Sequence, residues 1–310
     1  MTAPRIVSFL PAATEMACAL GLADQIIGVS HECDYPHGMR EKPVVVRNAL
    51  DLAQLAPSEI DRVVSTTVGE GNNLYAVDEP LLRSLAPDII LTQDLCQVCA
   101  PSGSDVTRVI GSLRPSPDVL YFTPRTMADV DSDLQMLGDA TGRRAEADAI
   151  IASNRARLES VAAKLQHIRH RPRVFFAEWV DPIFCAGHWV PEMIALAGGD
   201  DPLGRSGSDS VRVSWDDVVA SAPEVIIIAP CGYSMAAALE QVELFASKPE
   251  WSTLPAVQDG RVFAVDANSY FARPAPRLVD GVELLAHLFH PSETAWCGAA
   301  GAWSPARSRR

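Results

Sequence analysis

The chain has 310 residues, of which 48% are hydrophobic, and a formal net charge of −13 at pH 7. This length allows one large domain or two small ones, with enough apolar residues for a substantial core. The acidic balance argues against nucleic acid or an anionic membrane surface as a partner, because phosphate groups are bound by Lys and Arg.

The first part of the chain alternates short apolar runs with helical patterns. Strands are predicted at residues 5–9, Ile26–Ser30, Asp88–Thr92 and Val119–Phe122, and helices at Ala12–Leu20 and Ser58–Thr67, the latter with Ser58 as N-cap. Polar loops follow two of these strands, at His31–Pro36 and Gln93–Cys99.

A long helical pattern occupies the middle of the chain, from Arg143 to about Arg169. Gly142 separates it from a shorter helical pattern, and Pro172 stops it. It could be a surface helix of one large domain or a rigid strut between two lobes. We favour the strut, because Leu82–Thr92 and Val219–Ala229, on either side of it, share one helix–turn–strand pattern.

The last part repeats the alternation. Strands are predicted at Arg173–Ala177, Val225–Ala229 and Arg261–Val265, and helices from Val190, at Trp215–Ala220 and at Pro276–His290. The segments Glu178–His188, Asp200–Ser210, Pro230–Tyr233 and Asp266–Pro276 are predicted as loops, the second of them exposed. Strands that alternate with helices indicate parallel sheets, whose ligands bind outside the carboxyl ends of the strands.

Several stretches of residues 5–290 resemble one known family. They are Arg5–Glu15, Gly28–Ser30 with Asp34–Pro36, Leu85–Ile90, and Phe271–Arg277. These stretches are similar to the class III periplasmic binding-protein superfamily, the helical-backbone metal receptors, and most to the cobalamin-binding proteins that serve ABC importers. The resemblance implies an α/β fold with two Rossmann-like lobes, parallel sheets, a long rigid connecting helix and a ligand cleft between the lobes.

Combining pattern and resemblance, we expect four regions. They are an N-terminal α/β lobe at 1–125, linking helices at 126–171, a C-terminal α/β lobe at 172–290 and a flexible tail at 291–310. Because a continuous helix resists bending, we expect ligand binding to move the lobes little.

Three features differ from the transport members of that superfamily. The chain shows no secretory signal before Ile6, so it is expected to be cytoplasmic as given, or extracytoplasmic if a leader was removed. Cobalamin receptors tend to carry a Trp where this chain has Gln93-Asp94. The Glu with which transport members contact an ABC permease corresponds to Ala272, so the docking carboxylate is expected to be missing.

The residues expected to bind the ligand lie in the loops after the strands. They are His31, Glu32, Asp34, Tyr35, Gln93, Asp94, Glu178, Trp179, Asp181, His188, Trp189, Tyr233, Asn268, Tyr270 and Arg273. The aromatic members offer the rigid surface that a large flat ligand needs, and we expect Tyr35 and Tyr270 to face it. His31 and His188 are the candidates to reach a corrin cobalt.

Cysteines supply the candidate metal ligands. Cys96-x-x-Cys99 has a chelating spacing, and Cys33 and Cys231 follow other strands. The alternatives are ordinary reduced thiols and a redox dithiol. Separately, Glu178, Asp181 and His188 in one loop could perform acid–base chemistry, ligate a metal or hydrogen-bond ligand amides.

The sequence therefore predicts a binding protein for a cobalamin-like corrinoid or a related metal chelate, without catalysis. No G-x-S-x-G elbow, Walker loop or G-x-G-x-x-G after a strand is present. The alternative is a Zn- or Fe-dependent enzyme that uses the Cys96, Cys99 and His188 region.

Overall fold

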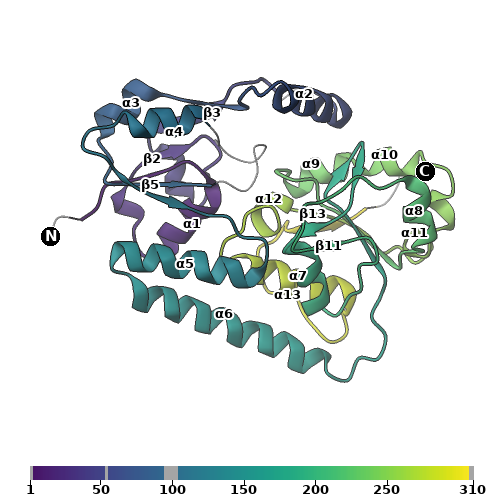
Figure 1. The fold of residues 1–310 in the computed structure, drawn as a ribbon. Coiled ribbons are helices and arrows are strands. Elements are labelled where there is room, and N and C mark those ends of the chain that lie inside the picture. Colours follow the sequence, from purple (N-terminus) through teal and green to yellow (C-terminus); the bar gives the residue numbers. More distant parts are fainter. Residues whose placement is uncertain (1–2, 53–54, 94–103, 307–310) are drawn as a thin grey trace. The chain divides into compact units, whose positions relative to one another are not determined.

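The structure, a computed structural model, describes residues 3–52, 55–93 and 104–306. Its contacts divide into two compact units: unit 1 is Met1–Pro124 with Ala128–Ile151, and unit 2 is Arg125–Met127 with Ala152–Arg310. Each unit combines a mainly parallel sheet with helices (Figure 1). The α/β fold class with parallel sheets is therefore confirmed.

Unit 1 is built on a six-stranded sheet in the order β4-β3-β2-β1-β5-β6. The strands are β1 (Ile6–Ser8), β2 (Ile26–Ser30), β3 (Val44–Asn48), β4 (Tyr75–Val77), β5 (Ile89–Thr92) and β6 (Asp118–Tyr121). Only the β3–β4 pair is antiparallel. The central strands β1 and β5 are fully buried, as expected for strands that are covered on both faces.

The helices of unit 1 are α1 (Pro11–Ala19), α2 (Pro57–Gly69), α3 (Glu79–Leu85), α4 (Ser104–Gly111) and α5 (Met127–Thr141). The predicted N-cap Ser58 is wrong: the N-cap position is Ala56, whose backbone N–H donates to the Glu59 carboxylate at 3.1 Å. Strands β3 and β4 were not predicted, because Val44–Val46 is a run of only three apolar residues before Arg47 and Asn48.

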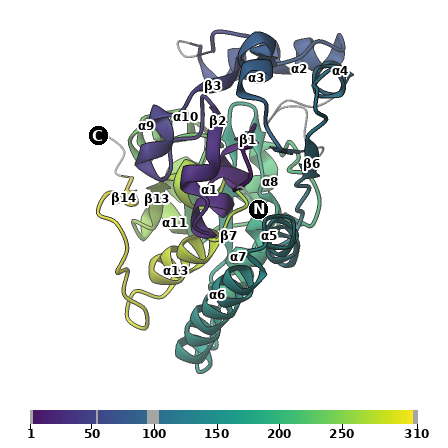
Figure 2. The same ribbon diagram turned by 90° about the vertical axis from the view of Figure 1, so that its left-hand side faces the viewer.

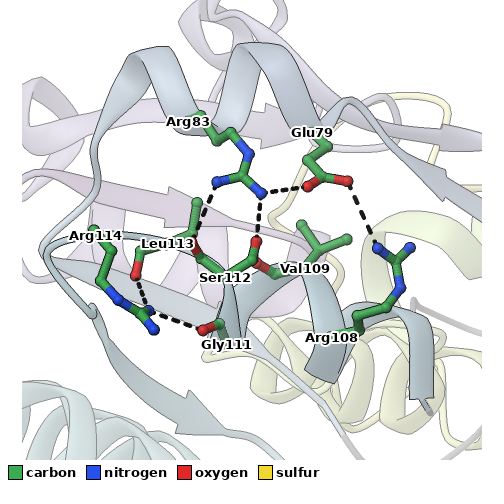
Figure 3. A network of polar contacts seen from close by, with 8 residues as sticks. All are labelled: Glu79, Arg83, Arg108, Val109, Gly111, Ser112, Leu113 and Arg114. Atoms are coloured by element: carbon green, nitrogen blue, oxygen red, sulfur yellow. Dashed lines mark hydrogen bonds and ion pairs between the residues drawn. The ribbon is translucent and has the colours of Figure 1, made fainter.

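An arginine network fixes α4 on α3 (Figure 3). Arg83 donates to the Glu79 carboxylate at 2.5 Å and to the Ser112 hydroxyl at 2.7 Å. Arg108 on α4 lies 3.9 Å from the other oxygen of Glu79. Arg114 donates to the carbonyls of Gly111 and Leu113, of which the first belongs to the last turn of α4, where a helix leaves carbonyls without intrahelical partners.

Helix α6 (Arg144–Leu165) begins in unit 1 and ends in unit 2. It ends four residues before the predicted Arg169. Gly142, at φ +69°, makes the turn from α5, and a Cβ on Gly138 would make a tight contact of 3.0 Å with that of Ala147. Figure 2 shows the resulting pair of adjacent helices.

Unit 2 is built on a four-stranded sheet in the order β14-β13-β12-β7. The strands are β7 (Val174–Ala177), β12 (Val225–Ile228), β13 (Val262–Val265) and β14 (Trp303–Pro305), of which only β14 is antiparallel. Phe175, Ile226, Phe245 and Trp251 form the centre of its core. The prediction of a flexible tail after Pro291 is wrong for β14, which pairs with β13.

Two small sheets stand where the sequence predicted loops. An antiparallel hairpin joins β8 (Trp179–Val180) to β9 (Ile183–Phe184), and β10 (Gly187–His188) pairs in parallel with β11 (Arg205–Ser206). The predictions of Glu178–His188 and Asp200–Ser210 as loops are therefore wrong at these strands. Strands of two residues are too short to show a hydrophobic period.

The helices of unit 2 are α7 (Val190–Leu196), α8 (Trp215–Ala220), α9 (Met235–Glu240), α10 (Val242–Ala246), α11 (Pro255–Gln258), α12 (Ala267–Tyr270) and α13 (Leu278–Phe289). Helix α12 lies inside the predicted loop Asp266–Pro276. Arg157 of α6 pairs with Asp280 and, at 2.6 Å, with Glu283 of α13, so ion pairs hold the second half of α6 in this unit. No helix of the described residues is long and apolar enough to cross a bilayer.

Candidate functional site

In unit 1, the residues after β2 lie at the carboxyl edge of parallel strands. The His31 N–H donates to the Val46 carbonyl at 2.9 Å, which fixes the start of the turn on β3. The His31 ring lies 6.4 Å from that of Tyr75, and its Nε2 is 3.9 Å from the Glu32 carboxylate. Asp34 pairs with Arg40 at 3.1 Å, and Tyr35 is 45% exposed. This edge therefore presents polar and aromatic groups to solvent.

Two predicted members of this edge are buried. Cys33 is 2% exposed, with Sγ 3.0 Å from the Thr14 hydroxyl. Gln93, directly after β5, is 8% exposed. Asp94, Cys96 and Cys99 lie outside the described residues, so the predicted chelating pair stays a prediction.

In unit 2, the hairpin β8–β9 follows the carboxyl end of β7. Glu178 accepts a hydrogen bond from the Gly187 N–H at 3.0 Å, so its carboxylate ties the hairpin to β10. Asp181 is exposed at the hairpin turn. The Trp179 ring meets Tyr233, which follows β12, edge to face at 5.6 Å. The single loop that was predicted to unite Glu178, Asp181 and His188 is therefore divided among β8, β9 and β10. The Glu178 carboxylate binds a backbone N–H in this arrangement.

His188 and Trp189 stand between β10 and α7. The backbone of His188 is in the left-handed region, at φ +50°. Its Nε2 lies 3.2 Å from an Asp209 oxygen, and burial lowers the pKa of His188, with Asp209 opposing that effect. Trp189 is 7% exposed, and its indole N–H donates to the Phe271 carbonyl at 2.8 Å.

The sequence reasoning missed the partners of this segment. Arg125 lies 3.4 Å from Asp209, and Glu192 accepts a hydrogen bond from the Met127 N–H, the first helical residue of α5. Asp201 accepts from the N–H groups of Leu203 and Gly204. In the sequence, Gly207 indicates a turn near Asp209. No sequence pattern predicts that Asp209 lies beside His188.

The loop after β13 carries the remaining candidates. The Asn268 N–H donates to the Tyr233 carbonyl at 3.1 Å, so the segments after β12 and β13 are joined. Tyr270 is 8% exposed and meets Trp296 edge to face, and Arg273 is 7% exposed. The expectation that Tyr270 faces a ligand is not supported by this burial.

Metal-ligating groups do not cluster in the part of the chain that the structure describes: no set of three His, Cys, Asp or Glu residues there could hold an ion. Cys185 is buried, and burial raises the pKa of its thiol. Cys231, after β12, is exposed.

Comparison with known proteins gives one consistent picture. The chain matches the family described as periplasmic binding protein over residues 6–269. A vitamin B12-binding protein of Vibrio cholerae is 26% identical over 286 residues, which cover 91% of this chain and 87% of that protein.

Two solved structures share the fold. A periplasmic heme binding protein from Pseudomonas aeruginosa has a TM-score of 0.73 at 21% identity, with each chain covered completely. The periplasmic vitamin B12 binding protein BtuF of Vibrio cholerae has a TM-score of 0.64 at 23% identity, covering 93% of this chain and 96% of that one. At these identities the two structures show the fold alone.

Proposed function

The chain belongs to the periplasmic binding protein family, and from this premise we propose that it binds a metal chelate of the corrinoid class. The family is one of binding proteins, which agrees with the prediction of a protein without catalysis and gives no support to the metal-dependent enzyme. The 26% identical relative named for vitamin B12 supports the corrinoid among the possible chelates.

The aromatic pair Trp179–Tyr233 is the observation that carries the proposal. It stands at the carboxyl edge of β7 and β12, where parallel sheets bind their ligands. Burial raises the pKa of Tyr233, so its hydroxyl stays protonated and can donate to a ligand amide. Rigid aromatic faces with a few polar groups suit a large, flat and partly polar ligand.

Equilibrium dialysis with cyanocobalamin tests the proposal. We expect saturable one-to-one binding, and a Tyr233→Ala variant that binds about tenfold more weakly, a loss of about 1.4 kcal/mol. The control is Trp303→Ala, which removes half of a similar edge-to-face pair, Phe263–Trp303 at 5.6 Å, on β14. Absence of binding below about 100 μM, a free energy weaker than about −5.5 kcal/mol, would remove the corrinoid.

An ABC permease is the proposed partner, since the resembling transport proteins serve such importers. The resemblance implies that Ala272 corresponds to the docking carboxylate of those proteins, and we propose this correspondence as a test. Ala272→Glu should therefore strengthen binding to a permease of this class in detergent, while leaving the affinity for cyanocobalamin unchanged. Equal permease binding by both forms would show that this position does not contribute to docking.

A further inference from the structure

Arg212 lies on an extended segment that adds a third strand to the hairpin β8–β9. Phe184 of β9 is paired with Trp179 of β8 on one side and forms an antiparallel bridge with Arg212 on the other. Backbone hydrogen bonds of 3.1 and 3.0 Å flank this bridge and join residues 183–185 to residues 211–213. Trp179, Phe184 and Arg212 therefore stand directly opposite one another, and we call these three residues the hairpin row.

The hairpin row lies on the outer face of this small sheet. Val180, Ile183 and Val213, which adjoin the row along the three segments, pack in or against the core of unit 2. Because successive side chains of a strand point to opposite faces, the row points away from that core. Arg212 is exposed, and the two aromatic members of the row are half-buried. The row is thus an accessible surface on a buried support.

The row continues the aromatic pair that carries the proposed function. Trp179 meets Tyr233 edge to face at 5.6 Å, and the guanidinium carbon of Arg212 lies 5.6 Å from the centre of the Phe184 ring. Two strand spacings separate Trp179 from Arg212, a distance of about 10 Å. A large ligand that lies against the aromatic pair therefore has a cation beside its rim.

The contact with Phe184 suits the Arg212 guanidinium to the recognition of an anion. A cation–π contact restrains the side chain, so less rotamer freedom is lost when a ligand binds. Arginine is always charged and binds phosphate or carboxylate through two parallel N–H···O bonds, also when it stacks on a ring. Because the whole chain carries a net charge of −13, recognition of an anionic group depends on a local cation of this kind.

We propose that Arg212 binds an anionic group of the ligand, the phosphodiester of a complete corrinoid. The proposal rests on the proposed function and adds a specificity to it. The chain prefers corrinoids that carry their nucleotide over cobinamide, which lacks both the phosphodiester and the nucleotide base. If Arg212 only covered the Phe184 ring, its replacement would change the affinity for all corrinoids alike.

Equilibrium dialysis of two corrinoids tests the inference. Cyanocobalamin carries the phosphodiester, and dicyanocobinamide has the same corrin ring without it. The wild-type protein should bind cyanocobalamin about tenfold more tightly than dicyanocobinamide, as expected for a hydrogen bond to a charged group. Arg212→Gln should lower the affinity for cyanocobalamin about tenfold and leave that for dicyanocobinamide unchanged, so that the preference disappears.

Salt dependence distinguishes the phosphodiester from the nucleotide base. In the wild-type protein, the affinity for cyanocobalamin should fall as NaCl rises from about 0.01 M to about 1 M, because salt screens exposed charges. The Arg212→Gln variant should not respond to salt, and Arg212→Lys, which keeps the charge, should retain part of the preference. The matched control is Arg205→Gln, at an exposed arginine of β11, which should change neither affinity.

The negative outcomes separate this inference from the proposed function. Equal affinity of the wild-type protein for both corrinoids, an equal loss of both affinities in Arg212→Gln, or a preference that does not respond to salt overturns the inference alone. Binding of neither corrinoid below about 100 μM overturns the proposed function and the inference together.

Discussion

The two units present the carboxyl ends of their strands differently. In unit 1, the residues after β2 form a turn in which Tyr35 is 45% exposed and Asp34 pairs with the exposed Arg40. In unit 2, two small sheets, β8–β9 and β10–β11, follow β7. Backbone hydrogen bonds from Cys185 to Val211 and from Arg205 to Ala186 tie their strands to the neighbouring segments. The second arrangement holds its residues by paired backbones before a ligand arrives, and the first presents its residues on a turn.

The largest loss of folding stability is expected at Gly187, where the segments of the small sheets pack most tightly. Gly187→Ala should cost about 3 kcal/mol, the upper range for overpacking, because its Cβ would meet the backbone of Ser210 rather than a movable side chain. Gly38→Ala in unit 1, where nothing lies within 4 Å, should cost little. Urea unfolding measures both, and equal stability of the two variants would contradict the difference between the edges.

The next largest loss of stability is expected when Arg157 of α6 is replaced. Arg157→Met leaves Asp280 and Glu283 side by side without their shared cation and should cost about 2 kcal/mol. Arg144→Met, at the start of the same helix, removes exposed pairs with Asp139 and Asp148 and should cost much less. Thermal unfolding of the two variants compares the two ends of α6. A larger loss of stability in the Arg144 variant would contradict this prediction.

Asp201 should make unit 2 sensitive to pH. Burial raises its pKa from 3.8 to about 7, and one carboxylate oxygen has no hydrogen-bond partner. The folded state therefore binds the proton more tightly, so stability falls as pH rises from about 4 to about 7. Asp201→Asn should remove this loss and stabilise the protein at pH 8, with no gain at pH 4.

Asp133 on α5 is the matched site in unit 1. Burial, followed by the charge of Asp129, raises its pKa to about 7, and one of its oxygens also lacks a partner. Asp133→Asn should show the same pH profile with a smaller gain, since Asp133 is less deeply buried. Urea midpoints at pH 4, 6 and 8 test both variants, and a gain that is independent of pH would refute the titration.

The smallest change in stability is expected when the indole N–H of Trp189 or Trp179 is removed. Trp189→Phe leaves the buried Phe271 carbonyl without its donor and should cost about 1 kcal/mol. Trp179→Phe removes a similar bond to the Asp181 carbonyl at the exposed hairpin turn, where water replaces it, so stability should hardly change. Denaturation midpoints that rank these variants in the opposite order would contradict the burial argument.

Long apolar runs made much of the fold predictable. Val225–Ile228 and Ile89–Thr92 are buried on both faces and read as strands without help from the rest of the chain. The candidate site was harder to predict from the sequence. His188 was singled out by its residue type, but its partner Asp209 reaches it through the pairing of β10 with β11, which no local pattern encodes. Glu178 illustrates the opposite error, since a carboxylate chosen for chemistry supports a backbone N–H.

Strand β14 has a consequence for the order in which the protein is made. It covers the edge of β13, yet it emerges from the ribosome only after α13 has been synthesised. Until then the nascent sheet offers a row of unpaired backbone groups beside an apolar core, a template for pairing with other chains. Faulty synthesis that stops between α13 and β14 would therefore release a chain with a nearly complete core and an open edge.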